Sequence, residues 1–387
     1  MRGLYHQMLP FTPDSCGAAA VFADTSATVV PIDKNGTAST YWSRLGAGAG
    51  SCMQVVSPFD IGEMSFVLSD DEDYLSSLVQ AVAYQSSDFV VLLHGPVSSM
   101  TGVDLSRLAE ELEERIARPV LAVDCSGSRP YDEGLSQAML AVFERVEADG
   151  AAAHEVEPDS INVLGLNAVD HNDVNERWMF AETLLGQVAS SVLSYWGCFG
   201  GWSEWSLAPA AERNVVMSVS AARLAKKMER CWGIPALYFD ELDLELFDSQ
   251  TAEALQHVAL GRRILVVGEQ LSANVVRKAL VGADVRKGGR GVTVASFFRM
   301  LPDHRCEQDL QFASERDCAK VLGSGGFDFV VGDAALRRFV PEDVGFFELP
   351  HSAIADPMGF IDSGAVTPLS QDWFWGLARA LEGGVTR

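Results

Sequence analysis

Cys16, in the stretch "FTPDSCGAAAVF", is the first residue with an evident chemical interpretation. The run of small residues predicts a helix that begins near this cysteine. A helix N-terminus lowers the pKa of a thiol, and so favours the thiolate that binds a metal ion or an iron–sulfur cluster. Cysteine is also often buried as a small apolar residue without any further role. Both interpretations stay open at Cys16.

Two histidines follow apolar runs that predict strands. His94 ends "DFVVLLHG" (88–95), and ligands of open α/β sheets gather at the carboxyl ends of strands. His351 lies with Asp356 in "LPHSAIADPMG", where the two side chains can donate protons to a bound molecule. The alternatives are a hydrogen-bonded structural histidine at His94 and a simple Asp-Pro turn at Asp356.

A basic loop stands out in an otherwise acidic chain. The stretch "RKGGRGV" (286–292) carries Arg286, Lys287 and Arg290 among three glycines. Guanidinium groups and backbone amides can bind a phosphate, a carboxylate or the acidic tail of a cofactor. A solvated loop is the alternative. No stretch has the spacing of a GxGxxG or Walker loop, so we do not expect nucleotide binding by this chain.

Short β-branched or aromatic runs alternate with amphipathic stretches, which predicts parallel α/β units. The expected strands are 64–69, 88–95, 119–125, 161–168, 214–220, 235–241, 262–269, 328–333 and 345–350. The expected helices include 71–85, 104–117, 220–233 and a C-terminal helix, "LSQDWFWGLARALEGG", with an aromatic face.

These elements fall into three sets, which predicts an α/β protein of three Rossmann-like domains with parallel sheets. We place the first domain at 1–157, the middle domain at 158–258 and the third at 259–350. Residues 351–387 form a C-terminal loop and a helix that docks back onto the rest of the molecule.

Charge and cysteine content exclude several classes of function. The 53 acidic residues against 29 basic ones give a formal charge of −24, which repels nucleic acid and anionic membranes. The seven cysteines show no CxxC spacing, and this favours a reducing compartment over a disulfide framework. We therefore expect a cytoplasmic protein without a membrane span.

Five patches, in this order, resemble the nitrogenase component 1 family, which includes the nitrogenase iron–molybdenum protein subunits, their cofactor scaffolds and the dark-operative protochlorophyllide reductase subunits. The patches are "SPFDIGEMSFVLSDDEDYLSSLVQAV", "DFVVLLHGPVSSMTGVDLSRLAEELEERIARPVLAVDCSGSR", "INVLGLNAVD", "APAAERNVVMSVSAARLAKKMERCWGIPAL" and "FELPHSAIADPMGFIDSGAVTPLSQDWFWGLARALE". The resemblance implies three α/β domains, an iron–sulfur cluster at a subunit interface, and electrons delivered by an ATP-dependent reductase similar to the nitrogenase iron protein.

The set of cluster ligands that the resemblance implies is incomplete here. Cys16 matches the first cluster cysteine, but Thr37 replaces the second and Gly95 the third. His94, next to Gly95, and Cys52, in "GAGSC", are candidate substitutes. On the strand where true nitrogenases carry the cysteine of their active-site cofactor, this chain has Met217, which argues against the same cofactor.

Three hypotheses follow from the resemblance. In the first, the chain is a nitrogenase-like oxidoreductase subunit that pairs with an identical or different component 1-like subunit, accepts electrons through an interface cluster and reduces a small molecule. In the second, it is a scaffold on which a metallocofactor is assembled. In the third, it is a clusterless ligand-binding or partner subunit, which the two missing cysteines favour.

Overall fold

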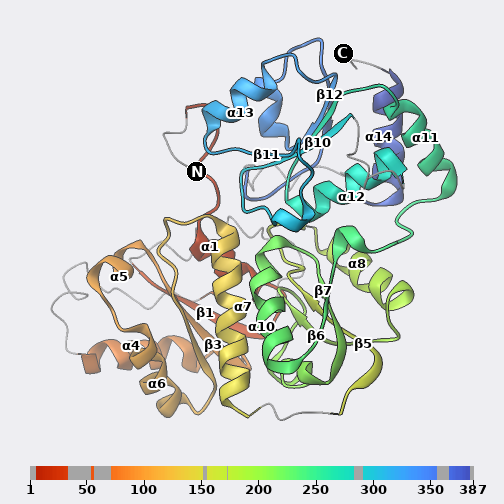
Figure 1. Cartoon of the computed structure of the whole chain (residues 1–387). Helices are drawn as coiled ribbons and strands as arrows, with labels where there is room; N and C mark the ends of the chain where they lie inside the picture. The colour runs from red at the N-terminus through yellow and green to blue at the C-terminus, as the bar shows by residue number, and fades with distance from the viewer. Residues whose placement is uncertain are drawn as a thin grey trace.

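Three parallel β-sheets with helices on their faces make up the chain (Figure 1). The computed structural model describes residues 6–33, 54–55, 71–150, 155–171, 173–282, 291–354 and 366–383. This architecture confirms the predicted α/β class with three parallel sheets. The domain boundaries given above stay a prediction. In the described residues no helix is both long and apolar enough to cross a bilayer.

The first sheet has the strand order β2-β1-β3-β4, with all neighbours parallel. Its strands are β1 (Ala27–Ile32), β2 (Gln54–Val55), β3 (Phe89–His94) and β4 (Val120–Val123). Its helices are α1 (Asp14–Ala20), α4 (Asp71–Ala83), α5 (Pro96–Thr101), α6 (Leu105–Ile116) and α7 (Tyr131–Ala148). The continuous apolar run of β3 is typical of a parallel strand that helices cover on both faces.

The second sheet has the order β6-β5-β7-β8, again with parallel neighbours. Its strands are β5 (Glu157–Leu164), β6 (Ser191–Trp196), β7 (Ala211–Val216) and β8 (Ala236–Tyr238). The helices around it are α8 (Val174–Gln187), the short α9 (Trp202–Trp205) and α10 (Ala222–Trp232). Helix α10 ends at Gly233, whose φ of 74° is the left-handed conformation that glycine adopts easily at a helix C-terminus.

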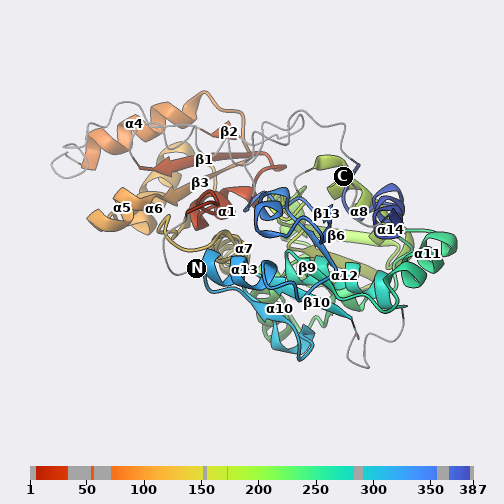
Figure 2. The ribbon, with the colours of Figure 1, turned by 90° about the horizontal axis from the view of Figure 1, so that it is seen from above.

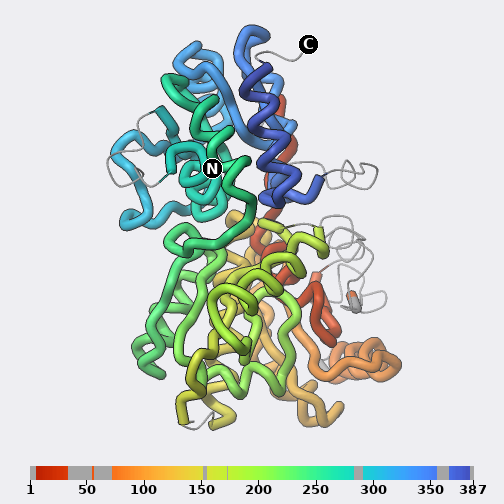
Figure 3. Tube along the Cα trace, turned by 90° about the vertical axis from the view of Figure 1, so that its right-hand side faces the viewer, coloured from red at the N-terminus to blue at the C-terminus, as the bar shows by residue number. Residues whose placement is uncertain are grey.

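The third sheet has five strands in the order β11-β10-β9-β12-β13. They are β9 (Ile264–Val267), β10 (Val292–Ser296), β11 (Leu310–Gln311), β12 (Phe329–Gly332) and β13 (Gly345–Glu348). Its helices are α11 (Ser249–Ala259), α12 (Gln270–Val281), α13 (Glu315–Leu322) and α14 (Gln371–Gly383). The aromatic face of α14 packs here, because Trp373 contacts Phe347 of β13 and Phe374 contacts Phe247. Figure 3 shows α14 lying beside α11.

The sheets are joined by helix packing and by ion pairs. Helices α7 and α10 lie side by side between the first and second sheets (Figure 1). Arg177 of α8 pairs with Asp24 at 2.9 Å, and both side chains are 5% exposed. Arg299, after β10, pairs with Glu133 of α7 and so ties the third sheet to the first. Figure 2 looks down on this arrangement and shows α4 far from α11 and α14.

Helices α1 and α7 touch through their backbones at two glycines. A Cβ atom added to Gly17 would lie 2.1 Å from the carbonyl oxygen of Tyr131. A Cβ atom added to Gly134 would lie 1.7 Å from the carbonyl oxygen of Asp14. Only glycine permits this close approach at either position.

Candidate functional site

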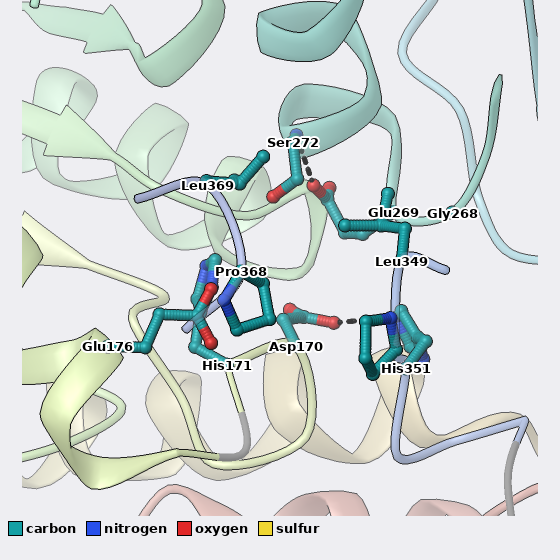
Figure 4. A pocket seen from close by; sticks show the side chains of 11 residues that line it. Asp170, His171, Glu176, Gly268, Glu269, Ser272, Leu349, His351, Pro368 and Leu369 are labelled. Atoms are coloured by element: carbon teal, nitrogen blue, oxygen red, sulfur yellow. Dashed lines mark hydrogen bonds and ion pairs between the residues drawn. The ribbon is translucent and has the colours of Figure 1, made fainter. Parts of the chain in front are cut away.

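A small pocket, partly open to solvent, lies between the second and third sheets (Figure 4). Asp170 and His171 reach it from the loop after β5, Glu269 from the end of β9, and His351 from the segment after β13. Pro368 and Leu369, just before α14, close one side. The pocket thus lies beyond the carboxyl ends of three parallel strands. Open α/β sheets commonly bind ligands at this edge.

Asp170 is the centre of a buried hydrogen-bonded group at this pocket. Its Oδ1 accepts a 2.5 Å hydrogen bond from the Tyr131 hydroxyl, and its Oδ2 accepts one of 2.6 Å from the Asn167 amide. The Nε2 of His351 lies 3.3 Å from Oδ1. Burial alone would raise the pKa of Asp170, but the hydrogen bonds and positive charge of His351 and the Tyr131 hydroxyl lower it to about 2. Asp170 is therefore a carboxylate at neutral pH.

His351 is held in one orientation and one tautomer. Its Nδ1 accepts a hydrogen bond from the backbone N–H of Ala353, so the neutral ring carries its proton on Nε2, which faces Asp170. Its own backbone N–H donates to Asp333, and its ring stacks on Phe298 with centroids 5.3 Å apart. The Nε2 also lies 3.3 Å from the Tyr131 oxygen. Tyr131, Asp170 and His351 thus form a connected path along which a proton can move.

His171 and Glu176 form a second buried pair at the pocket. The Nδ1 of His171 lies 3.0 Å from Glu176 Oε1, and the two side chains are 1% and 3% exposed. Burial disfavours the charged imidazolium, but the negative charge and hydrogen bond of Glu176 raise the pKa of His171 above its ordinary value. The other ring nitrogen, Nε2, is buried and has no hydrogen-bond partner among the described residues.

Glu269 is the second residue after β9 and the N-cap of α12. Its two carboxyl oxygens accept hydrogen bonds from the backbone N–H groups of Ser272, at 2.9 Å, and Val219, at 3.0 Å. Burial, together with the negative charge of Asp170, raises the pKa of Glu269 to about 8. The pocket therefore contains two neighbouring carboxyl groups with widely separated pKa values, an arrangement that is common in sites of proton transfer.

Residues 36–243 match the sequence profile of a family described as nitrogenase component 1 type oxidoreductase. This match covers more than half of the chain. The chain belongs to the nitrogenase component 1 family. The resemblance inferred from the sequence patches is thereby confirmed.

Similar proteins agree with this assignment to the nitrogenase component 1 family. The nitrogenase molybdenum-iron protein alpha chain of Azospirillum brasilense is 24% identical over 169 residues, and the match covers 41% of this chain and 33% of that protein. The chain thus matches only about a third of the length of this curated relative. The solved structure of nitrogenase Cp1 at pH 6.5 superposes with a TM-score of 0.71 at 11% identity, over 99% of this chain and 93% of that one. Nitrogenase Cp1 at pH 5 gives 0.68 at 14% identity, over 100% and 90%.

Cys16, the expected first cluster ligand of this component 1 chain, lies in α1 with no exposed surface. It belongs to the same apolar core as Cys125, whose pKa burial raises, with the charge of Asp14 adding to the effect. A cluster needs thiolates, and an apolar core disfavours them. The packing interpretation of Cys16 therefore describes its surroundings better than the ligand interpretation.

The position of the third expected cluster ligand is filled by another side chain. A Cβ atom added to Gly95 would lie 1.8 Å from Oδ2 of Asp33, so the Asp33 carboxylate takes the space of a cysteine side chain. His94, the proposed substitute, has both ring nitrogens engaged, Nε2 with the carbonyl of Val103 at 3.0 Å and Nδ1 with Asp124 at 3.2 Å. In the described arrangement, the space beside Gly95 and both ring nitrogens of His94 are therefore occupied by other groups of the chain.

The remaining expected ligands lie elsewhere or outside the described residues. Met217 is fully buried after β7, where the family resemblance places a cofactor cysteine. Cys52, Thr37, Arg286, Arg290 and Asp356 fall outside the described residues. Within the described ranges, no three His, Cys, Asp or Glu side chains lie where they could hold a metal ion together. The sequence-based cluster ligands are thus not assembled by the part of the chain that the structure describes.

Proposed function

We propose that this chain is the ligand-binding subunit of a nitrogenase-like oxidoreductase and that its substrate, a small molecule, binds in the pocket between the second and third sheets. The observation that carries the proposal is the convergence of Asp170, Glu269 and His351 from three strand ends on one pocket. Buried acids and histidines with shifted pKa values are frequent in catalytic sites. The family assignment supplies the reaction class, a reduction.

Protons are what the residues of this chain contribute to such a reaction. Reduction of a bound molecule commonly consumes a proton with each electron, and the proton has to come from a group near the substrate. His351 is the proposed donor, through its Nε2–H, and Asp170 and Tyr131 connect to it. Asp356, predicted to share this role, stays a proposal because it lies outside the described residues.

The electrons would come from a partner, an ATP-dependent iron–sulfur reductase similar to the nitrogenase iron protein. An interface iron–sulfur cluster would have to draw most of its ligands from a second component 1-like subunit, identical or not. This follows from the buried Cys16, the space at Gly95 that Asp33 fills, and the engaged nitrogens of His94. Cys52, Arg286 and Arg290 remain proposed cofactor contacts outside the described residues.

One experiment tests both the partner and the reduction. The tagged chain would be isolated without oxygen from its own cells, with ATP and a phosphate analogue that traps ATP-dependent complexes. We expect an iron–sulfur ATPase to co-purify, and the assembly to oxidise dithionite in an ATP-dependent manner when the substrate pool of the cell extract is added. The His351→Gln variant should form the same complex but consume dithionite at least tenfold more slowly. Isolation of the chain without such an ATPase would overturn the proposal.

A clusterless binding subunit is the second candidate, and Asp33 favours it. The carboxylate that occupies the space beside Gly95 leaves no room for a ligand from that position. In this case the purified complex would contain iron only in the ATPase, or none. Iron assay of this chain after separation from its partners distinguishes the two candidates.

A further inference from the structure

We propose that Thr12 is a positioning residue for His351, and that it acts through the peptide group between Ser352 and Ala353. The inference rests on the proposed function, because it concerns the residue that is proposed to donate protons at the pocket. It gives a role to the segment of chain that precedes α1.

The segment before α1 is held at both of its ends. Residues 6–12 form no helix or strand, and chain ends of this kind are usually poorly ordered unless other groups hold them. The carboxylate of Glu315, in the first turn of α13, accepts a hydrogen bond of 2.8 Å from the backbone N–H of His6. At the other end, Thr12 is 1% exposed, and its backbone N–H donates to the carbonyl oxygen of Ala353 at 3.1 Å. The segment is thus fixed between α13 and the stretch after β13.

One peptide group connects Thr12 to His351. The hydroxyl of Thr12 donates to the carbonyl oxygen of Ser352 at 3.2 Å. The N–H of the same peptide group belongs to Ala353, and it donates to Nδ1 of His351 at 3.2 Å. Because a peptide group is planar, its C=O and its N–H turn together. A rotation that takes the carbonyl away from Thr12 therefore also takes the N–H away from His351.

The N–H of Ala353 decides which ring nitrogen of His351 carries the proton. A neutral imidazole has one N–H, and a donor that faces Nδ1 makes Nδ1 the acceptor, which leaves the proton on Nε2. Nε2 is the atom that lies 3.3 Å from Oδ1 of Asp170. A carbonyl that accepts a hydrogen bond also makes the N–H of its own peptide group a stronger donor, since hydrogen bonds in a chain polarise one another. The Thr12 hydroxyl therefore favours the tautomer that the proposed proton transfer needs.

An aromatic contact from the same segment supports the plane of the His351 ring. Phe11 packs against Phe298 with ring centroids 5.6 Å apart. Phe298 in turn stacks on His351, with centroids 5.3 Å apart and an angle of 21° between the planes. Functional side chains keep one geometry when the packing and hydrogen bonds of their neighbours restrict their rotamers. Residues 11 and 12 thus restrain His351 through its ring and through the adjoining backbone.

The test compares two variants that differ in the hydroxyl of residue 12. Thr12→Val keeps the shape of the side chain and the backbone N–H but removes the donor to Ser352, whereas Thr12→Ser keeps that donor. The full chain would be labelled with ¹⁵N-histidine, and the signals of His351 assigned by their absence in His351→Gln. At a pH where the ring is neutral, the ¹⁵N shifts of its two nitrogens measure the ratio of the tautomers.

We expect Thr12→Val to change the tautomer ratio of His351 about fivefold in favour of Nδ1–H, which is the effect of one net hydrogen bond. Thr12→Ser should keep the wild-type ratio. Ser352→Ala is the matched control, because the Ser352 hydroxyl is buried without a hydrogen-bond partner among the described residues and its removal leaves both contacts of the peptide group in place. An unchanged ratio in Thr12→Val, or an equal change in Thr12→Ser or in the control, would overturn the inference.

The tautomer measurement needs no electron donor, partner or substrate, so it can fail or succeed separately from the proposed function. If the ratio changes as expected and no ATP-dependent reduction is found, the positioning of His351 by Thr12 stands and the proposed function fails. If reduction is found and Thr12→Val leaves the ratio unchanged, the proposed function stands and this inference is wrong.

Discussion

The pocket and the loop after β3 both stand at the carboxyl ends of parallel strands, yet their polar atoms are used differently. At the loop, His94 uses both ring nitrogens and the backbone N–H of Gly95 donates to Ser98. At the pocket, the charged pairs leave Nε2 of His171 and Oγ of Ser272 without described partners. The loop thus uses its polar groups within the chain, whereas the pocket keeps two buried polar atoms that no described residue satisfies.

The largest effect should come from breaking the charged group of the pocket. Asp170→Ala removes the acceptor of the Tyr131 hydroxyl and the counter-charge of His351, all of them buried. We expect a loss of about 3–5 kcal/mol in the free energy of unfolding, measured by urea denaturation. The matched change at the loop, Asp124→Ala, should cost less than about 1 kcal/mol because that side chain is 78% exposed. If Asp170→Ala and Asp124→Ala lowered the free energy of unfolding equally, the charged group of the pocket would be no more important for stability than the exposed pair at the loop.

The raised pKa of Glu269 makes stability depend on pH. The native state keeps a proton on Glu269 up to about pH 8, whereas the unfolded chain releases it near the ordinary value of 4.5. The stabilising effect of that proton is complete below the unfolded pKa and is lost as the pH rises. Between about pH 5 and about pH 8 we expect wild type to lose about 3 kcal/mol more than Glu269→Gln. Parallel stability curves for the two proteins would contradict the raised pKa.

Restoring a cysteine at Gly95 should test the filled space in the loop. Gly95→Cys places its Cβ atom against the Asp33 carboxylate, and we expect it to destabilise the protein by about 2 kcal/mol. Adding Asp33→Ala should recover most of this loss in a double-mutant cycle. Gly186→Ala is the control, because nothing lies within 4 Å of the added Cβ atom there and the helix should gain stability. Additive losses in the double mutant would show that Asp33 does not fill the space.

The smallest effect is expected at Cys16. Cys16→Ala removes one buried sulfur and should cost about 1 kcal/mol, similar to Cys125→Ala at the equally buried Cys125. If the cluster ligands come mainly from a partner, the iron content of the anaerobically isolated chain should be the same in both variants. If Cys16→Ala lost iron and Cys125→Ala did not, Cys16 would be a cluster ligand after all.

Eight of the thirteen strands in the described residues could be predicted from apolar runs, whereas β1, β2, β6, β10 and β11 were missed. The predicted strand at 64–69 lies outside the described residues. Strand β1 was not predicted, because Pro31 argues against a strand inside a sheet. In the described register β2 lies opposite Thr28 and Val29, while Pro31 lies opposite Leu93 of β3. Strand β6, "SVLSYW", mixes serines with apolar residues and gives a weaker signal.

The site was harder to predict than the fold. His351 was singled out because it follows a strand, and the structure places it in the pocket. Asp170 and His171 follow the predicted strand at 161–168, and Glu269 ends the run "RRILVVGE", so the same rule applied to every strand would have selected them. The pairing of these residues depends on how the second and third sheets face each other. Periodicity along one chain does not contain that information.

The two glycine contacts between α1 and α7 give the molecule a mechanical property. Because Gly17 touches the carbonyl of Tyr131 and Gly134 touches that of Asp14, the two helix backbones are in direct contact at these positions, with no side chain between them. Helix α1 carries Cys16, and α7 begins with the tyrosine whose hydroxyl binds Asp170. A larger residue at Gly17 would therefore have to displace the backbone of Tyr131, and with it the hydroxyl that binds Asp170 at the pocket.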